Sequence, residues 1–168
     1  INKRDYFQLF PSLSVTYNQS DKNIFFLNYG RRIDRPLYDE LDPFRVYSSP
    51  KAYSEGNPFL QRSLSNFLEV SHTYDNFLTT ALSFNHTTNG RQQVTYLDNS
   101  SSIQVTRFQN FLTSYSYELA NIIVFNALKW LESSNTLVAF YQTVYSSLPT
   151  QDKTQGFGYY MATNNQIH

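Results

Sequence analysis

The chain has 168 residues, a net charge near zero and no cysteine, which excludes disulfides, thiolate metal sites and a cysteine nucleophile. Its 13 basic and 13 acidic residues argue against a general nucleic-acid-binding protein, which usually carries a basic excess. Aromatic residues make up 17% of the chain and charged residues only 15%, whereas globular proteins average about 25% charged residues. This composition is typical of β-rich proteins.

Period-two alternation predicts about seven strands, and helical periodicity is nearly absent. The strands are expected over approximately these ranges: Phe10–Tyr17, Asn23–Ile33, Leu64–Tyr74, Phe77–Leu97, Ile103–Val124, Asn135–Tyr145 and from Gly156 onward. Asn89-Gly90 lies inside the fourth range, where it is either a second hairpin turn or part of a continuous strand. The best helical candidate is Asn121–Glu132.

Short and long connections alternate along the predicted strands. Short turns are expected at Ser20–Asn23, at Asp75-Asn76 and near Asn126–Ser133. The connections between them are longer and more polar: "DNSSS", "SSLPTQDKTQ" and the stretch from Leu37 to Leu60, whose prolines break regular structure. Short turns at one end and long loops at the other are typical of outer-membrane barrels, whereas a β-sandwich has turns of mixed length at both ends.

The two sides of each predicted strand differ in chemistry. Leu13, Val15 and Tyr17 share one side of the first strand, and Ser14 and Thr16 share the other. Several strands exceed ten residues, whereas sandwich strands average about 5–6, and a barrel strand that crosses a membrane needs about 9–11. No apolar run approaches the ~20 residues of a membrane-spanning helix. The pattern favours a lipid-facing side with aromatic residues and a polar, water-filled lumen.

Four motifs occur in order and at close spacing: "LFPSLSVTY", "LNYGRRIDRPLYDELDPF", "AYSEGNPFL" and "LEVSHTY". They resemble the C-terminal barrel of TonB-dependent receptors, in the outer-membrane β-barrel family common in Bacteroidetes. The second half of the chain matches that family only in rhythm, including Lys129-Trp130 near a turn. We therefore expect an all-β, antiparallel up-and-down meander of about seven strands, forming an arc of a transmembrane outer-membrane β-barrel.

The resemblance implies a full-length receptor with a plug domain and a barrel of about 22 strands, which imports bulky nutrients using energy supplied through TonB. Residues 1–168 are expected to be a barrel fragment without the plug, because the chain opens on "INKRDYF" and closes on "NNQIH". The implied partners are outer-membrane lipid and lipopolysaccharide, the TonB system through the plug region, and a surface lipoprotein. The implied location is the bacterial outer membrane.

Two strand-end motifs have a structural and a functional interpretation. Arg31, Arg32 and Arg35, followed by Pro36, either bind an anionic substrate or lipopolysaccharide phosphate or pair with the neighbouring acids Asp34, Asp39, Glu40 and Asp42. The second interpretation is preferred, because the acids almost balance the arginines. Gly56, Asn57 and Pro58 form either a substrate loop or, preferably, a fixed turn, with Gly56 permitting a positive φ.

Ligand contact is expected from the aromatic residues of the long connection, which can stack on sugars or flat siderophores; the alternative is that they pack on the barrel rim. These residues are Tyr38, Phe44, Tyr47, Tyr53 and Phe59. His72, His86 and His168 make only a weak metal signal, and no catalytic or phosphate-loop motif occurs. We expect no enzyme activity, no cofactor and no metal. The alternative to the barrel is a soluble secreted β-sandwich or jelly roll that binds carbohydrate.

Overall fold

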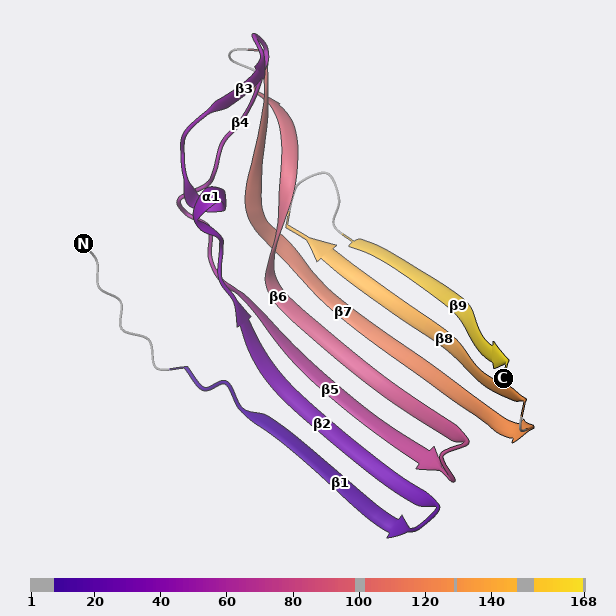
Figure 1. The fold of residues 1–168 in the computed structure, drawn as a ribbon. Helices are drawn as coiled ribbons and strands as arrows, with labels where there is room; N and C mark the ends of the chain where they lie inside the picture. The colour runs from indigo at the N-terminus through magenta and orange to yellow at the C-terminus, as the bar shows by residue number, and fades with distance from the viewer. Residues whose placement is uncertain (1–7, 99–101, 129, 148–152, 168) are drawn as a thin grey trace.

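The computed structural model describes residues 8–98, 102–128, 130–147 and 153–167, which form one nine-stranded sheet and a short helix (Figure 1). In chain order the elements are β1 (Ser12–Ser20), β2 (Asn23–Asp34), α1 (Tyr38–Leu41), β3 (Val46–Ser49), β4 (Ala52–Ser54), β5 (Ser63–Tyr74), β6 (Leu78–Asp98), β7 (Ile103–Leu128), β8 (Leu131–Ser146) and β9 (Lys153–Ile167). Within these ranges no helix is long and apolar enough to cross a membrane.

The seven long strands β1, β2, β5, β6, β7, β8 and β9 form the predicted antiparallel meander, each paired with the next. Strand β2 pairs with β5 along its whole length, from Asn23 opposite Tyr74 to Asp34 opposite Ser63. Its 12 residues span about 36 Å along the strand. At the ~35–45° tilt of barrel strands that length covers roughly 25–30 Å, close to the ~25 Å apolar band of an outer-membrane barrel.

The connections fall at two opposite ends of the meander, as the sequence predicts. The turns β1–β2, β5–β6 and β7–β8 lie together at the lower right of Figure 1, and the longer connections lie at the upper end. The third short turn is tighter than expected, because Leu128 already pairs with Leu131. Parts of "DNSSS" and "SSLPTQDKTQ", the opening "INKRDYF", Lys129 and His168 lie outside the described residues.

The helical candidate Asn121–Glu132 is wrong. Asn121 to Leu128 continue β7, and Glu132 belongs to β8. Ile123 lies opposite Leu78 of β6 and Asn135 of β8, so the segment is hydrogen-bonded between two neighbouring strands. Pairing on both sides satisfies the backbone and overrides a local apolar run that resembles a helix.

The register aligns the alternating side chains of the seven strands into two faces, since directly opposed residues share a face. On β5, for example, Leu68 and Val70 lie on one face, whereas Glu69 and Ser71 lie on the other. The first, called here the apolar face, carries a band of exposed side chains across all seven strands: Leu13, Val15, Tyr17, Phe25, Leu68, Val70, Leu82, Tyr117, Leu119, Leu137, Tyr141, Phe157, Tyr159 and Met161.

The opposite face, called here the polar face, carries mainly hydroxyl, amide and carboxylate groups. One row across it contains Asn28, Glu69, Ser83 and Glu118. Apolar side chains such as Phe140 are interspersed, and Gly158 lies directly opposite Phe140. A Cβ at Gly158 would lie 2.8 Å from Cε1 of the Phe140 ring, so glycine gives that ring its space.

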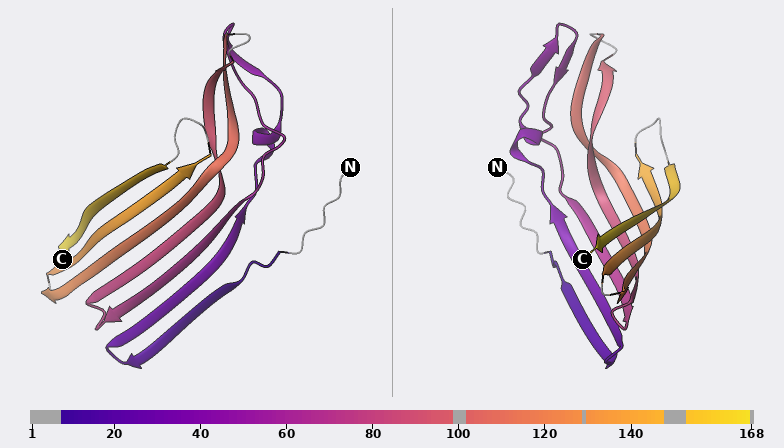
Figure 2. Two further views of the ribbon diagram at one scale, coloured as in Figure 1. Left: turned by 180° about the vertical axis from the view of Figure 1, so that it is seen from behind. Right: turned by 45° about the vertical axis from the view of Figure 1, so that its right-hand side comes forward.

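The upper parts of β6 and β7 project beyond the sheet and are joined by β3 and β4 (Figures 1 and 2). We call this projection, made of β3, β4 and residues 89–98 and 103–110, the arm. Contrary to the expectation of an irregular connection, the segment between β2 and β5 contains α1 and the β3–β4 hairpin. Strand β4 pairs in parallel with β7, with Tyr53 opposite Val105. Strand β8 pairs with β7 only from Leu112 onward, so the edge of β7 before Leu112 is left open. Strand β4 covers part of that open edge.

Asn89-Gly90 is a bulge within β6 and not a hairpin turn. The β6–β7 register shifts on both sides of Gly90, and Asn89 has a φ of 54°. Asparagine tolerates this left-handed conformation better than most residues. A bulge increases local twist and bends a strand, and β6 and β7 bend where they leave the sheet (Figure 2).

The sheet is a single open layer. Among the described residues only Tyr53, Val105 and Val138 are buried hydrophobic side chains. The first and last strands, β1 and β9, each pair on one side only, and their residues are almost all exposed. A β-sandwich or jelly roll buries a core between two sheets, and the described strands form one sheet. The soluble sandwich alternative is therefore wrong for this chain.

Candidate functional site

The candidate site lies at the upper rim of the sheet, where the β2–β5 connection meets the arm. Backbone hydrogen bonds join the two: Glu55 N–H donates to the Thr106 carbonyl at 3.0 Å, and Gln104 N–H donates to the Lys51 carbonyl at 2.8 Å. Below them, the Asn110 side chain accepts from Gln61 N–H at 2.7 Å and donates to the Gln61 carbonyl at 2.9 Å. These bonds fasten the connection to β7 at several heights.

The Gly56-Asn57-Pro58 segment is a fixed turn in this structure. Gly56 N–H donates to the Asp42 carbonyl at 2.8 Å, and the Asn57 side-chain amide donates to the Phe108 carbonyl at 3.0 Å. Gly56 does not use the positive φ that glycine permits, since no glycine in the described chain has one. Glycine is needed for space: a Cβ would lie 2.6 Å from the Asp42 nitrogen and collide with the Asp42 carbonyl oxygen.

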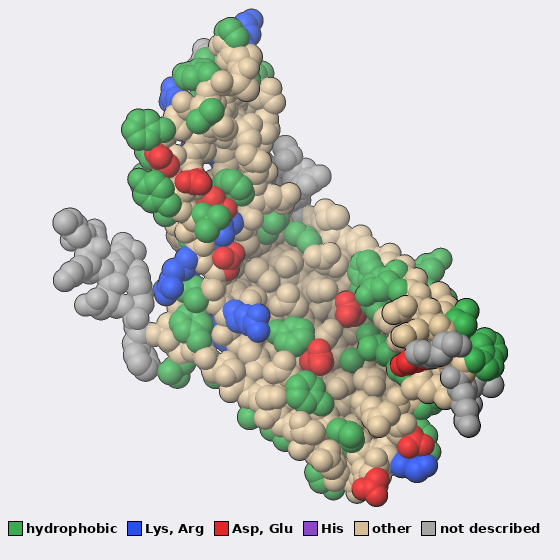
Figure 3. Space-filling model, viewed as in Figure 1, with side chains coloured by type: hydrophobic (Ala, Val, Ile, Leu, Met, Phe, Trp, Pro, Cys, Tyr) green, Lys and Arg blue, Asp and Glu red, His purple; other side chains and the backbone are tan. Residues whose placement is uncertain are grey.

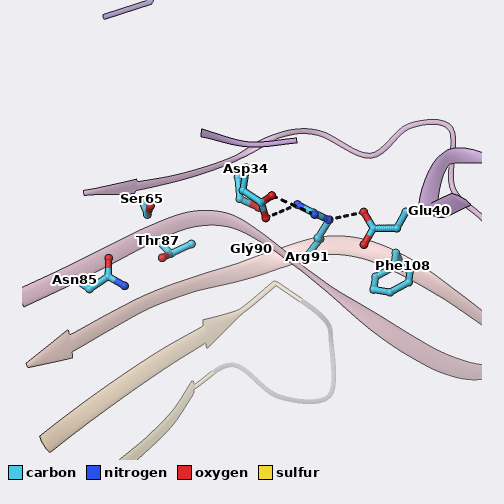
Figure 4. A pocket seen from close by; sticks show the side chains of 9 residues that line it. Asp34, Glu40, Ser65, Asn85, Thr87, Gly90, Arg91 and Phe108 are labelled. Atoms are coloured by element: carbon cyan, nitrogen blue, oxygen red, sulfur yellow. Dashed lines mark hydrogen bonds and ion pairs between the residues drawn. The ribbon is translucent and has the colours of Figure 1, made fainter. Parts of the chain in front are cut away.

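Arg91, directly after the bulge, joins three parts of the rim (Figure 4). Its Nε donates to Glu40 Oε2 of α1 at 2.8 Å, and its Nη1 donates to Asp34 Oδ2 at the end of β2 at 2.8 Å. Nη2 donates to the Arg35 carbonyl at 3.3 Å. The Arg91 and Glu40 side chains are only 11% and 13% exposed, whereas Asp34 is 69% exposed. The Arg91–Glu40 pair is therefore the better shielded of the two, and removing either partner would leave the other charge nearly buried and uncompensated.

Burial lowers the pKa of Arg91, but hydrogen bonds and charge attraction from Asp34 and Glu40 outweigh it, so that the net pKa lies above the ordinary arginine value. The guanidinium is thus charged at every physiological pH. A buried charge of this kind is tolerated because its donors are matched by carboxylate oxygens. Arg91 was not among the residues selected from the sequence, where it is a lone arginine after an Asn-Gly pair.

The expected pairing of Arg31, Arg32 and Arg35 with neighbouring acids is wrong. Asp34 and Glu40 pair with Arg91, and no carboxylate among the described residues forms an ion pair with any of the three. Alternation places Arg31 on the apolar face and Arg32 on the polar face. Arg35 and Pro36 follow the last residue of β2, where the chain leaves the sheet.

We call Arg91 with its partners Asp34 and Glu40 the Arg91 clamp. A cavity of about 410 Å³ lies beside this clamp on the polar face (Figure 4). Its walls combine hydroxyl, amide, charged and aromatic groups from Asp34, Glu40, Ser63, Ser65, Asn85, Thr87, Gly90, Arg91 and Phe108. Because the clamp already matches Arg91 with two carboxylates, the cavity offers mainly neutral hydrogen-bonding groups. Such a lining suits a polar, uncharged portion of a solute such as hydroxyl groups.

The five aromatic residues selected from the sequence divide into two groups. Tyr38, Phe44 and Phe59 are 79%, 80% and 86% exposed, and Tyr47 is 58% exposed. Tyr53 differs, since it is only 9% exposed. Four of the five are therefore accessible to a solute, whereas Tyr53 is packed within the protein.

Tyr53 belongs to the small core of the arm. Its ring lies 5.4 Å from the Tyr47 ring and 4.6 Å from the Arg45 guanidinium carbon. Desolvation and the nearby Glu55 carboxylate raise the pKa of Tyr53 above its ordinary value. Glu55 in turn accepts from Arg45 Nε at 3.2 Å and lies 3.8 Å from Arg107 Nη1. Alternation alone could not distinguish this tyrosine, because its burial depends on the long-range pairing of β4 with β7.

Charged side chains gather at this rim and not on the broad sheet. Figure 3 shows basic and acidic groups around α1 and the upper end of β2, and few over the face of the sheet below. No group of three or more potential metal ligands occurs in the described ranges. His72 bonds Asn23 at 3.0 Å and stacks on Phe25, and His86 stacks on Tyr115.

Comparisons with known proteins agree with this architecture. The model of a family described as "Outer membrane protein beta-barrel family" matches residues 1–168. The fold is similar to that of the siderophore receptor PirA from Pseudomonas aeruginosa, with a TM-score of 0.65 and 16% identity over 93% of this chain and 34% of that one. A mutant of the ferric enterobactin receptor PfeA from the same organism gives a TM-score of 0.59 and 13% identity over 93% of this chain and 32% of that one.

The search of curated proteins found no match. The chain spans about a third of the length of the two solved receptors, and at these identities the likeness establishes the fold. The apolar face is the lipid-facing surface and the polar face lines the lumen, as in other outer-membrane barrels. With its whole length matched by the family model, the chain belongs to the outer membrane protein β-barrel family and lies in the bacterial outer membrane.

Proposed function

We propose that this chain is part of the barrel wall of a TonB-dependent receptor that imports a bulky nutrient such as a glycan or a siderophore. The observation that carries the proposal is the continuous lipid-facing band on seven strands in register, opposed by a polar face. The likeness of the fold to the barrels of two siderophore receptors supports it. The chain contributes a wall and a rim and carries out no chemistry.

In this proposal the rim contacts the solute as it enters. Long connections of outer-membrane barrels face the cell exterior, so the arm and the cavity beside Arg91 lie on the side from which a nutrient arrives. The exposed rings of Tyr38, Phe44, Tyr47 and Phe59 offer stacking surfaces for sugars or flat chelates. The cavity offers hydroxyl and amide groups from Ser65, Asn85 and Thr87.

Two partners belong to the same proposal. TonB would act through a plug region elsewhere in the full-length protein. A surface lipoprotein that delivers the nutrient would meet the exterior side, where the arm projects beyond the sheet (Figure 1). The exposed β3 edge of the arm, from Val46 to Ser49, is accessible for such a contact.

Uptake measurements on the full-length protein in its own cells test the proposal. Cells lacking the gene, and cells lacking TonB, are given a panel of labelled ferric siderophores, cobalamin and oligosaccharides. We expect uptake of one of these classes to be lost equally in both strains and restored by the intact gene. Unchanged uptake of every class, or uptake that persists without TonB, would overturn the proposal.

A further inference from the structure

The acidic side chains of the long strands lie on one face of the sheet, whereas the basic side chains at the end of β2 lie on both, with Arg32 on the lumen side and Arg31 on the lipid-facing side. The register places Asp34, Glu69, Glu118 and Glu132, the described acids of the long strands below the arm, on the lumen-lining face. Arg31, in contrast, lies on the lipid-facing side, two residues above Tyr29 and opposite Asn66. The upper margin of the lipid-facing surface therefore has an excess of positive charge.

A second cavity, of about 660 Å³, opens on this lipid-facing side. It is lined by Arg35, Pro36, Leu41, Gln61, Arg62, Leu64 and Asn89. Leu64 lies opposite Ile33 and Thr88 on the apolar face, whereas its neighbours Ser63 and Ser65 line the lumen-side cavity. The two cavities thus lie on opposite sides of the barrel wall.

The cavity combines two guanidinium groups with an apolar lower wall. Asp34 of β2 pairs with Ser63 of β5. Arg35 comes directly after Asp34, and Arg62 comes directly before Ser63, so the two arginines lie next to each other at the upper ends of neighbouring strands. Leu64, Leu41 and Pro36 supply apolar surface beside them. Guanidinium groups suit bidentate contact with phosphate, and apolar side chains below suit hydrocarbon.

The height of the cavity matches the lipid headgroups. From Asn23 to Arg35 the chain advances about 40 Å along β2. At a tilt of ~35–45° this is roughly 30 Å, just above the ~25 Å apolar band. The cavity lies at the end with the long connections, which faces the exterior, and so it meets the outer leaflet.

We propose that this cavity binds the phosphate of an outer-leaflet glycolipid, with Arg35 and Arg62 contacting the phosphate and Leu64 contacting the upper part of an acyl chain. Arg31, whose Nε is buried without a hydrogen-bond partner among the described residues, lies below as a further cationic contact. The inference rests on the position in the outer membrane and not on TonB-dependent import, so either can fail without the other.

Native mass spectrometry of the detergent-purified full-length protein tests the site. The probes are diphosphorylated lipid A, the same lipid A after removal of its phosphates, and inorganic phosphate. We expect adducts with the phosphorylated lipid, at least about tenfold weaker binding of the dephosphorylated lipid, and no displacement of the lipid by millimolar inorganic phosphate. The double variant Arg35→Gln/Arg62→Gln should weaken binding by at least about tenfold.

Arg32→Gln is the matched control, because Arg32 lies at the same strand end on the lumen side, and it should bind lipid as the wild type does. The charge-preserving variant Arg35→Lys/Arg62→Lys should keep most of the binding, and it replaces the Gln variant if that variant fails to fold. Equal binding of both lipids, loss of binding in Arg32→Gln, undiminished binding in the Gln variant, or displacement by inorganic phosphate would each overturn the proposal.

Discussion

Arg91 Nε lies 2.8 Å from Glu40 Oε2, and this bond joins the strand that carries the arm to the helix of the β2–β5 connection. The two residues are 51 positions apart in the chain. Both side chains are nearly buried, so the bond is shielded from water and salt. This ion pair therefore reinforces the backbone and side-chain hydrogen bonds that hold the connection against the arm.

Replacing Arg91 with Gln should loosen the rim. The variant leaves the Glu40 carboxylate buried without its cation, which costs about 3 kcal/mol when a buried pair loses one member. Limited proteolysis of the full-length protein measures this, and we expect cleavage within residues 37–62 to become at least about tenfold faster. Combining Arg91→Gln with Glu40→Gln should restore part of the resistance, and resistance unchanged by the single variant would contradict the role given to the pair.

Gly56→Ala should disturb the turn that holds the connection against Asp42. The added methyl group meets the Asp42 backbone, and overpacking of this kind costs about 1–3 kcal/mol. Hydrogen exchange at residues 55–57 should be faster in the variant. Gly30→Ala is the control, since a Cβ there meets nothing within 4 Å. If both variants exchange alike, the spatial requirement at Gly56 is refuted.

Tyr53 and Phe59 should respond to alanine substitution in opposite ways. Tyr53→Ala removes a buried ring from the core of the arm and should destabilise it by about 2–4 kcal/mol. Phe59 is 86% exposed, so Phe59→Ala should leave stability within about 0.5 kcal/mol of the wild type and lower nutrient uptake. Thermal unfolding and uptake assays separate the two effects. A destabilised Phe59→Ala protein would show that this ring packs on the rim.

Adjacent residues on β6 should tolerate charge very differently. Leu82 lies on the lipid-facing side and Ser83 on the lumen side. Leu82→Arg should destabilise the protein folded in a bilayer by about 2–4 kcal/mol, the cost of arginine near the bilayer midplane. Ser83→Arg should cost less than about 1 kcal/mol, because its charge reaches water. Denaturant titrations in lipid vesicles measure both, and equal costs would count against the assignment of the faces.

The sequence predicts the seven-strand meander well because strand alternation is a local signal. Leu68 to Ser71 show it within four residues, and the short turn at Asp75-Asn76 follows directly. The arm is less predictable, since β4 has three residues and owes its existence to the open edge of β7 about fifty positions away. For the same reason, local charge balance assigned Asp34 and Glu40 to nearby arginines, whereas Arg91 reaches them through the folded sheet.

Asn89-Gly90 is a second place where long-range pairing overrides a local sequence signal. The pair is typical of tight hairpins, and Asn89 does adopt a positive φ. In β6, however, both flanking segments already pair with β7. The tertiary pairing turns a local hairpin signal into a bulge that bends the strand toward the arm.

The most direct test of the account is a spin-label scan of β5 in the full-length protein within the outer membrane. This chain contains no cysteine, so single cysteines at residues 67 to 72 label it without background from its own sequence. We predict that labels at 68, 70 and 72 collide mainly with oxygen dissolved in lipid, and that labels at 67, 69 and 71 collide mainly with a water-soluble nickel chelate. Equal accessibility along the strand, or the opposite alternation, would contradict a barrel wall that separates lipid from a wet lumen.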